Sequence, residues 1–424
     1  MNSIGSVAVI GLGYIGLPTA AILATNGIRV VGVDINRSTV EAVNRGEVPF
    51  AEPDLSVYVT GAVGQGNLSA STETPESRAY IVAVPTPFKL DKSPDLSYID
   101  AAARGIAPKL KGGELIILES TSPPGATQHL GEYLVELRPD LSLTGDNGRA
   151  RLHLAHCPER VLPGRVMIEL VTNDRIVGGI TSEAALLAKE LYEVFCQGEI
   201  HITDAATAEM AKLVENSYRD VNIAFANELS MICDQLDLNV WELIRLANHH
   251  PRVEILRPGP GVGGHCIAVD PWFIVDAAPE KSILIRAARE VNDAKPKHVV
   301  QKTLDCVKHE KVESITIFGL TFKPDIDDLR ESPALEIAYE IARAVHSLPI
   351  TIVEPHIEAL PEQLRGYANL SLMKKYVPAE SDLALFLVKH TQFQEMLKDE
   401  VQWAETIDAC GLFANTTPLK NSRG

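Results

Sequence analysis

The segment that ends at Cys266 has the most unusual local composition in the chain. Residues 258–266 read Pro-Gly-Pro-Gly-Val-Gly-Gly-His-Cys, so four glycines precede one cysteine. This glycine density indicates a loop whose backbone closely approaches a ligand, with a thiol at its end. Asp270 follows four residues later, one helical turn away if a helix begins there. The alternative is a buried structural cysteine after a turn, but the adjoining histidine and aspartate favour a working thiol.

A thiol at such a loop would support one particular oxidation. A thiolate adds to an aldehyde to give a hemithioacetal, the hemithioacetal loses a hydride to become a thioester, and water cleaves the thioester to a carboxylate. Oxidation of an alcohol to an acid needs this covalent step, whereas oxidation to a ketone does not. The chain would then also need a site for a hydride acceptor.

Residues 199–250 contain neither Gly nor Pro, and apolar residues recur there at helical spacing. The pattern predicts a long helix that ends near Asp237, with Thr203 or Asp204 able to cap its start. A shorter helix is expected from Trp241 to Ala247. A long helix between two α/β units often supplies a dimer interface as well as a spacer.

Polar residues form one face of the predicted long helix. Lys212, Asn216 and Arg219 lie at positions i, i+4 and i+7. This stripe is either a solvated surface or a site where Lys212 moves a proton or stabilises an oxyanion, with Asn216 beside it. A similar choice applies to His250 and Arg252 beyond the shorter helix, which either pair with an anionic substrate or cap helix carbonyls.

The N-terminus contains the sequence pattern of a dinucleotide site. A strand, a glycine turn, a helix, a second strand and an acidic residue follow one another at Val7–Ile10, Gly11–Gly16, Leu17–Thr25, Arg29–Val33 and Asp34. A GxGxxG motif alone is a weak signal, but in this context it predicts a Rossmann-type turn.

Each glycine of that turn has a separate physical purpose. Gly11 permits the tight turn, Gly13 lets the backbone approach a pyrophosphate, and Gly16 allows close packing of helix on strand. Asp34 would accept hydrogen bonds from the adenosine ribose diol and repel a 2′-phosphate. NAD is therefore favoured over NADP, although Arg37 nearby leaves the choice open.

Strand-like runs alternate with helix-length segments on both sides of the central stretch. The runs are Ala79–Val84, Leu115–Leu118, Leu152–Ala155, Ile315–Phe318, Ile350–Val353 and Leu383–Val388, with further helices expected at Ile283–Cys306 and Pro333–Val345. This alternation implies parallel sheets whose ligands lie at the carboxyl ends of the strands. We predict an α/β fold class with two Rossmann-like doubly wound domains, 1–203 and 309–424, joined by a long central helix region, 204–308.

Composition excludes several classes of protein. The chain has 39 Lys and Arg against 56 Asp and Glu, a net charge of −17, which argues against nonspecific nucleic-acid binding. Six scattered cysteines without CxxC spacing indicate a reducing cytoplasm and no structural zinc. The first 28 residues carry no charge, but their glycines and the lack of a basic start exclude a signal peptide or membrane span. The tail after Thr417 is expected to be frayed.

Seven motifs occur in order along nearly the full chain. They read GLGYIGLPTA, VPTPF, STSPPG, CPERVLPG, EMAKLVENSYRDVNIAFANE, HPRVEILRPGPGVGGHCIAVDPWF and GLTFKPDIDDLRESPA. Together they resemble the UDP-glucose/GDP-mannose dehydrogenase family. The sixth motif most resembles the branch that acts on UDP-N-acetyl-D-mannosamine. The resemblance implies an NAD-binding domain, a central dimerisation region and a sugar-nucleotide domain. It also implies a four-electron oxidation of a sugar C6 alcohol to a uronate, with two NAD molecules used in turn.

The resemblance also implies roles for individual residues. Cys266 matches the nucleophile, Lys212 the acid/base and oxyanion stabiliser with Asn216 beside it, Asp270 the residue linked to the hydrolytic water, and Glu159 an assisting carboxylate. Contacts to NAD would come from Gly11, Gly13, Tyr14, Ile15, Gly16, Asp34, Arg37, Thr86, one of Thr121 and Thr127, and Arg330. The sugar-nucleotide site would comprise Arg160, Val161, Lys212, Asn216, Arg219, His250, Arg252, Gly263 and Lys323. No metal is implied.

These implications leave open which substrate and which partners the protein has. A UDP-sugar substrate is multiply anionic, so a protein of net charge −17 must concentrate its cations in one cleft. UDP-N-acetylglucosamine, UDP-glucose and GDP-mannose are alternative substrates of the same class. A catalytically silent NAD-binding regulator is the alternative from another class. A cytoplasmic homodimer without nucleic-acid or membrane partners is expected.

Overall fold

The computed structural model describes residues 5–89, 91–162, 164–264, 266–310, 312–376, 383–397 and 403–414. Contacts within the chain group its residues into two compact units. The first unit comprises Met1–Glu215 and Trp272–Pro279, and the second comprises Asn216–Pro271 and Glu280–Gly424. His265, expected beside the thiol, and the tail after Thr417 lie outside the described residues.

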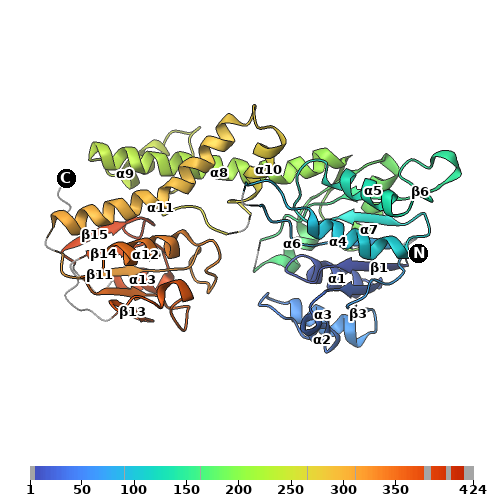
Figure 1. The fold of residues 1–424 in the computed structure, drawn as a ribbon, viewed down its shortest axis with the longest axis horizontal. Helices are drawn as coiled ribbons and strands as arrows, with labels where there is room; N and C mark the ends of the chain where they lie inside the picture. Colours follow the sequence, from blue (N-terminus) through green and yellow to red (C-terminus); the bar gives the residue numbers. More distant parts are fainter. Residues whose placement is uncertain are drawn as a thin grey trace. The chain divides into compact units, whose positions relative to one another are not determined.

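The first unit contains a sheet with the strand order β10-β9-β8-β5-β4-β1-β2-β3. Its strands β1 and β3 are labelled in Figure 1. Its strands are β1 (Ser6–Ile10), β2 (Arg29–Val33), β3 (Leu68–Ser71), β4 (Ala79–Val82), β5 (Leu115–Leu118), β8 (His153–His156), β9 (Arg175–Gly179) and β10 (Ile200–Asp204). A separate pair is formed by β6 (Leu141–Ser142) and β7 (Ala150–Arg151). The predicted strands of this half are confirmed, apart from shifts of one or two residues at the ends of β1, β4 and β8.

The predicted strands of this half pair parallel as expected, but the unpredicted strand β9 pairs antiparallel with β8. Neighbouring strands from β3 to β8 are parallel, but β8 and β9 pair antiparallel, with Ala155 opposite Gly179 and His156 opposite Gly178. A Cβ atom on Gly178 would lie 2.3 Å from the carbonyl oxygen of Asp204, so close packing requires glycine there. The sequence did not predict β9 because two glycines in this short strand interrupt the apolar pattern.

Helices cover both faces of this sheet. They are α1 (Gly16–Thr25), α2 (Arg37–Asn44), α3 (Leu55–Gly64), α4 (Ser97–Ile106), α5 (Ala126–Leu137), α6 (Val166–Thr172) and α7 (Ser182–Tyr192). Alternate residues of β1 belong to different apolar clusters: Val7 and Val9 pack with α1, α3 and α7, whereas Ala8 and Ile10 pack with α4 and α5. This alternation is what a doubly wound sheet requires.

The second unit contains a parallel sheet with the order β13-β12-β11-β14-β15. Its strands are β11 (Ile315–Phe318), β12 (Ile350–Val353), β13 (Leu370–Met373), β14 (Leu383–Phe386) and β15 (Glu405–Asp408), and its short helices are α12 (Pro333–Ala344) and α13 (Thr391–Met396). The chain order reverses between β11 and β14, which makes the carboxyl edge there the expected ligand edge. The second Rossmann-like sheet is therefore confirmed.

Among the described residues, four helices lie between β10 and β11 along the chain: α8 (Ala205–Leu236), α9 (Val240–Ala247), α10 (Asp270–Ala277) and α11 (Ile283–His309). The predicted long helix is confirmed as α8, which passes from the first unit to the second between Glu215 and Asn216. Asp204 caps it, because its carboxylate accepts hydrogen bonds from the Thr207 N–H at 2.9 Å and the Thr207 hydroxyl at 2.6 Å. Within the described residues, no helix is both long and apolar enough to cross a membrane.

Candidate functional site

The glycine turn between β1 and α1 has the geometry expected of a dinucleotide site. Gly11 has φ +97°, and a Cβ atom on it would lie 2.3 Å from the Ala83 carbonyl oxygen. A Cβ on Gly16 would lie 1.9 Å from the Gly11 carbonyl oxygen. By contrast, a Cβ on Gly13 would meet no atom within 4 Å. Packing therefore demands the first and third glycines, while the second faces open space where a pyrophosphate can approach.

Asp34 lies directly after β2 and is fixed against the same turn. Its carboxylate accepts hydrogen bonds from the Leu12 N–H at 2.9 Å and the Asn36 N–H at 2.8 Å. Arg37 is exposed at the first position of α2. Tyr14 is also exposed, with its ring 4.3 Å from that of Phe50. The acid that would read a ribose diol is thus held in place by the loop that would hold the phosphates.

Hydrogen bonds join the loops that follow β4 and β5, the strand tips, beside this turn. The Thr86 hydroxyl donates to the Thr121 carbonyl, and the Ser120 hydroxyl donates to the Val84 carbonyl at 2.6 Å. Thr121 is half-buried, whereas Thr127 in α5 is fully buried. Of the two threonines between which the sequence left the cofactor contact open, only Thr121 is partly exposed.

A buried carboxylate caps the helix that follows these tips. Glu209 in α8 accepts hydrogen bonds from the N–H groups of Gly125 at 2.6 Å and Thr127 at 2.7 Å, at the N-terminus of α5. Burial raises the pKa of Glu209, and these hydrogen bonds oppose the rise. The residue joins α8 to the β5 loop three residues before Lys212. Sequence reasoning missed it because nothing in the EMAK segment indicates which helix its acid would cap.

Glu159, the predicted assisting carboxylate, belongs to a buried polar cluster after β8. It accepts hydrogen bonds from the Arg160 N–H at 2.7 Å and from the Arg175 guanidinium at 3.3 Å. The Arg175 guanidinium in turn lies over the rings of Tyr192, at 4.9 Å, and Phe195, at 5.2 Å. Arg175 therefore both neutralises the charge of Glu159 and holds its carboxylate in place.

A second carboxyl group, Glu119, completes this cluster. The Tyr192 hydroxyl donates to it at 3.0 Å. Burial, and next the charge of Glu159, raises the pKa of Glu119 to about 8. Glu119 is thus protonated at neutral pH, and the cluster carries one carboxylate for its one guanidinium. Sequence reasoning missed both Glu119 and Arg175, which come from separate strands and carry no motif of their own.

Two of the predicted ligand-binding cations have acidic partners in the structure. Arg160 forms a two-pronged ion pair with Glu215, at 2.5 Å and 3.2 Å. Arg330 pairs with Asp328, with nitrogen to oxygen distances of 2.6 Å to 3.0 Å. Any anion that binds these guanidinium groups must share them with those carboxylates or displace them.

Cys266 and Asp270 are related by one helical turn, as their spacing predicted. The N–H groups of Val269 and Asp270 donate to the Cys266 carbonyl at 3.1 Å and 2.9 Å, and α10 begins at Asp270. Cys266 is exposed, whereas Asp270 is buried and its carboxylate accepts a hydrogen bond from the Asn216 side-chain amide of α8. The structure thus brings together three predicted catalytic residues.

At least two of the other cysteines, Cys157 and Cys306, are poor nucleophiles. All six lie within the described residues, none is in a disulfide, and Cys266 alone among them is exposed. Burial raises the pKa of the Cys157 thiol to about 12 and that of the Cys306 thiol to about 11. The thiol that the glycine-rich segment singled out is therefore also the accessible one.

The glycines before Cys266 have a packing role that the sequence did not predict. A Cβ on Gly263 would lie 2.5 Å from the Glu331 carbonyl oxygen and 2.9 Å from Cβ of Phe322. Gly264 has φ +83° and packs on the Phe322 ring. These two glycines also let the loop pack closely against the loop after β11, and the predicted approach of its backbone to a ligand stays a prediction. A pocket of about 180 Å³ lies between these two loops and includes Gly259, Gly261, Phe322 and Lys389 in its lining.

The remaining predicted residues lie on exposed or half-buried surfaces. In α8, Lys212 and Asn216 are half-buried and Arg219 is exposed. His250 and Arg252 are exposed after α9, where the His250 ring accepts the Arg252 N–H at 3.3 Å. The other three have these environments: Ile15 precedes α1 and is half-buried, Val161 is half-buried against the core of the first unit, and Lys323 is exposed after β11.

Three family models match the chain in succession. They are the NAD-binding domain of the UDP-glucose/GDP-mannose dehydrogenase family at residues 5–196, its central domain at 206–294 and its UDP-binding domain at 316–415. A relative from Ralstonia nicotianae, NDP-N-acetyl-D-galactosaminuronic acid dehydrogenase, is 54% identical over 96% of both chains. A relative from Escherichia coli K12, UDP-N-acetyl-D-mannosamine dehydrogenase, is 53% identical over 97% of this chain and 100% of its own.

Solved structures agree with these sequence comparisons. The UDP-D-ManNAc dehydrogenase of Pyrococcus horikoshii has a TM-score of 0.84 at 35% identity, covering 98% of this chain and 97% of its own. The UDP-N-acetyl-mannosamine dehydrogenase of Staphylococcus aureus has a TM-score of 0.82 at 40% identity, covering 96% and 95%. The chain therefore belongs to the UDP-glucose/GDP-mannose dehydrogenase family, whose members are NAD-dependent nucleotide-sugar oxidoreductases.

Proposed function

We propose that the protein oxidises the C6 alcohol of UDP-N-acetyl-D-mannosamine to UDP-N-acetyl-D-mannosaminuronate through a thioester on Cys266. One observation carries the proposal: the single exposed thiol lies one turn before a buried aspartate that is bound to Asn216. Relatives at about 53% identity that bear the name UDP-N-acetyl-D-mannosamine dehydrogenase support the choice of sugar.

The residues of the glycine turn fit NAD. Open space at Gly13 and the fixed carboxylate of Asp34 are what a pyrophosphate and a ribose diol need. When bound there, NAD accepts a hydride in each of the two oxidations. We assign the threonine contact to Thr121, since Thr127 is fully buried. Gly11, Gly16, Tyr14, Ile15, Arg37, Thr86 and Arg330 remain proposed cofactor contacts on the family resemblance.

The chemical steps belong to the side chains of the chain itself. Lys212 takes the proton from the C6 hydroxyl as the alcohol becomes an aldehyde, losing two electrons. The Cys266 thiolate then adds to the aldehyde carbon, and Lys212 with Asn216 stabilises the resulting oxyanion. Loss of a second hydride from this hemithioacetal gives the thioester. Water attacks the thioester with Asp270 and Glu159 assisting, and Cys266 leaves as a thiolate while the carboxylate departs.

A substrate panel with two readouts tests the reaction. NADH release and product mass are measured for UDP-N-acetylmannosamine, UDP-N-acetylglucosamine, UDP-glucose and GDP-mannose. The proposal expects two NADH per uronate with the first sugar. A yield of one NADH per sugar would refute acid formation.

Two substitutions test the assigned residues, with a third as a control. Cys266→Ser should abolish uronate formation while NAD binding and thermal unfolding stay as in the native protein. Lys212→Ala should lower kcat by about two to four powers of ten, because it removes an acid/base and oxyanion group. Cys196→Ser is a matched control, because its half-buried thiol only bonds backbone carbonyls, the nearer at 3.5 Å. Normal turnover by Cys266→Ser would overturn the mechanism.

A second sugar is favoured by one observation. The Ralstonia nicotianae relative at 54% identity is named for an N-acetyl-D-galactosaminuronic acid product. UDP-N-acetyl-D-galactosamine therefore joins the substrate panel, and the higher kcat/KM decides between the two C6 alcohols.

We also propose that the protein is a homodimer that associates through α8. Tyr218, Phe225, Ile232 and Leu236 of this helix are each at least 45% exposed. Their spacing of seven, seven and four residues places them on one helix face. Light scattering on the purified protein should give twice the mass of 46.1 kDa.

The domain boundaries and cellular setting complete the proposal. We assign NAD binding to 1–203, dimerisation with the catalytic Lys and Cys to 204–308, and sugar-nucleotide binding to 309–424. Six cysteines without a disulfide support a reducing cytoplasm, and the net charge of −17 supports a protein without nucleic-acid partners. Arg160, Val161, Arg219, His250, Arg252, Gly263 and Lys323 remain the proposed sugar-nucleotide contacts.

A further inference from the structure

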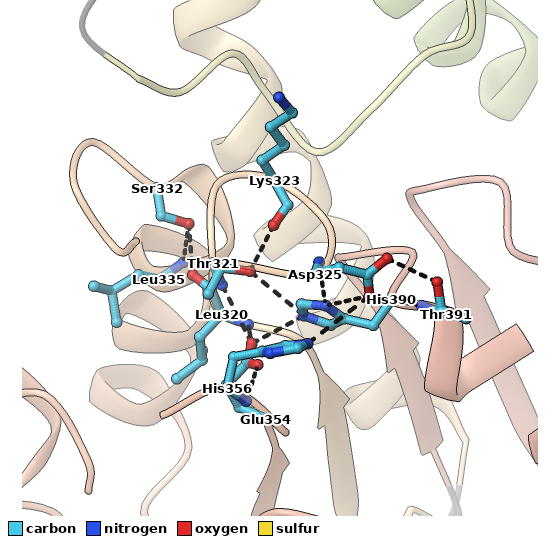
Figure 2. A network of polar contacts seen from close by, with 10 residues as sticks. All are labelled: Leu320, Thr321, Lys323, Asp325, Ser332, Leu335, Glu354, His356, His390 and Thr391. Atoms are coloured by element: carbon cyan, nitrogen blue, oxygen red, sulfur yellow. Dashed lines mark hydrogen bonds and ion pairs between the residues drawn. The ribbon is translucent and has the colours of Figure 1, made fainter. Parts of the chain in front are cut away.

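Three loops meet at the carboxyl edge of the second sheet, where the strand order reverses. They follow β11, β12 and β14, and a chain of polar contacts joins them (Figure 2). The two residues at the centre of that chain, Glu354 and His390, are fully buried. Neither residue has a part in the mechanism above.

Glu354 collects hydrogen bonds from all three loops. Its carboxylate accepts from the Leu320 N–H at 2.7 Å, the His356 N–H at 3.0 Å and the His390 ring at 3.1 Å. Burial raises the pKa of Glu354, but the hydrogen bonds from His390 and Leu320 outweigh it and leave the pKa below its ordinary value. A buried carboxylate thus fixes where the loop after β11 begins.

His390 fixes where the same loop ends. Its Nδ1 accepts the Asp325 N–H at 2.9 Å, so this nitrogen carries no proton and Nε2–H donates to Glu354. The Asp325 carboxylate is held by the Thr391 N–H at 2.9 Å and the Thr391 hydroxyl at 2.7 Å. Asp325 has φ +60°, a conformation that costs free energy outside glycine and needs such contacts to persist.

Lys323 lies between these two fixed points. Its carbonyl accepts the Thr321 hydroxyl at 2.9 Å, and its side chain is exposed and extends away from the network in Figure 2. The position of its ammonium group therefore depends on the hydrogen bonds that fix the two ends of the loop.

We propose that His390 and Glu354 are positioning residues that hold the Thr321–Asp325 loop so that Lys323 meets the diphosphate of the nucleotide sugar. This inference rests on the proposed function, in which Lys323 contacts the substrate. Neither residue touches substrate; both act through the backbone of the loop. Preorganising a flexible lysine in this way lowers the entropy lost when the anion binds.

The same cluster could be mistaken for a metal site. Asp325, His356 and His390 offer ligand atoms within 4.8 Å of one another. Both ring nitrogens of His390 are used in hydrogen bonds, however, and the Asp325 carboxylate is bonded to Thr391. The side chains of His390 and Asp325 are thus already engaged in the hydrogen bonds that hold the loop.

Two substitutions of His390 separate its two contacts. Gln can replace Nε2 as a donor to Glu354 but offers no acceptor to the Asp325 N–H, whereas Asn places an oxygen near the Nδ1 position. We expect His390→Gln to weaken UDP binding by about five- to tenfold in calorimetry, and to raise KM for the nucleotide sugar with little change in kcat. His390→Asn should restore the affinity to within about twofold. His346→Gln, an exposed histidine beyond α12, is the control.

A Lys323→Met variant makes the outcomes distinguishable. If Lys323→Met weakens UDP binding and His390→Gln adds nothing to it in the double variant, the inference is supported. If Lys323→Met weakens binding but His390→Gln alone does not, the positioning role is overturned while the proposed substrate contact stands. If Lys323→Met binds UDP normally, both assignments fail. Zinc binding by the native protein that His356→Ala removes would also overturn the inference.

Discussion

Alanine substitutions at Gly13 and Gly16 separate the packing role of the glycine turn from its role in cofactor binding. A Cβ on Gly16 would lie 1.9 Å from the Gly11 carbonyl oxygen, which is backbone and cannot move aside without opening the turn. A Cβ on Gly13 would have no neighbour within 4 Å. Gly16→Ala should therefore destabilise the protein, and Gly13→Ala should not.

The size of the effect at Gly16 follows from overpacking. Forcing a methyl group into a filled site costs about 1–3 kcal/mol, and better helix propensity returns at most about 1 kcal/mol. Because the 1.9 Å contact is with backbone, the cost lies at the upper end of that range, so the net loss is about 2 kcal/mol and lowers Tm by about 4–8 °C in a unit of this size. For Gly13→Ala the expected change stays within about 0.5 kcal/mol, the usual range for open surface sites.

The affinity for NAD should fall in Gly13→Ala, the variant whose stability is expected to stay unchanged. A methyl group on Gly13 would occupy the space through which a pyrophosphate reaches the helix N-terminus. Loss of one charge-assisted hydrogen bond costs about 1.5–3 kcal/mol, which is about 10- to 100-fold in the Kd for NAD. Gly13→Ala thus keeps its stability and loses affinity.

Calorimetry measures both quantities on the same preparations. Unfolding scans give Tm, and titration gives the Kd for NAD. Equal melting of Gly16→Ala and the native protein would refute the packing argument, and native affinity in Gly13→Ala would refute the placement of the pyrophosphate.

Two further predictions concern buried ionisable groups. Glu119 has a folded pKa of about 8 against an ordinary value of 4.5. The contribution of this group to the free energy of unfolding is therefore greatest below about pH 4.5 and is lost as the pH rises toward 8. Glu119→Gln should therefore raise Tm relative to the native protein, by more at pH 8 than at pH 5, and an equal difference at both pH values would contradict the buried neutral state. Iodoacetamide at neutral pH should label Cys266 first and leave Cys157 unmodified, because burial raises the pKa of Cys157 to about 12. Peptide mass spectrometry measures the order of labelling, and the reverse order would exclude Cys266 as the working thiol.

Regular elements with a strong local pattern were predictable from the sequence. The run Val7–Ile10, the glycine turn and Asp34 lie in one continuous stretch, so local rules alone specify them. The absence of Gly and Pro similarly predicted α8 to within a residue of its end. The strand β9 was missed because Gly178 and Gly179 resemble a turn, although packing against Asp204 demands glycine there.

The buried polar clusters were beyond sequence reasoning for a physical reason. Glu119, Arg175 and Tyr192 come from the end of β5, from β9 and from α7, and only the fold brings them together. The same holds for Glu354 and His390, each of which follows a different strand. The residues that motifs identify are those proposed to contact ligands, whereas the residues that hold them in place carry no recognisable spacing.

The path of the chain between its two units has a consequence for biosynthesis. The first unit consists of Met1–Glu215 and, much later, Trp272–Pro279. Its last segment includes Trp272, whose ring lies 5.5 Å from the ammonium group of Lys92. Because a ribosome releases the N-terminus first, this unit stays incomplete until the intervening stretch of the second unit has also emerged. The nascent chain must therefore hold a first unit whose sheet is complete but which lacks the Trp272–Pro279 segment while α8 and the cysteine loop are still being made.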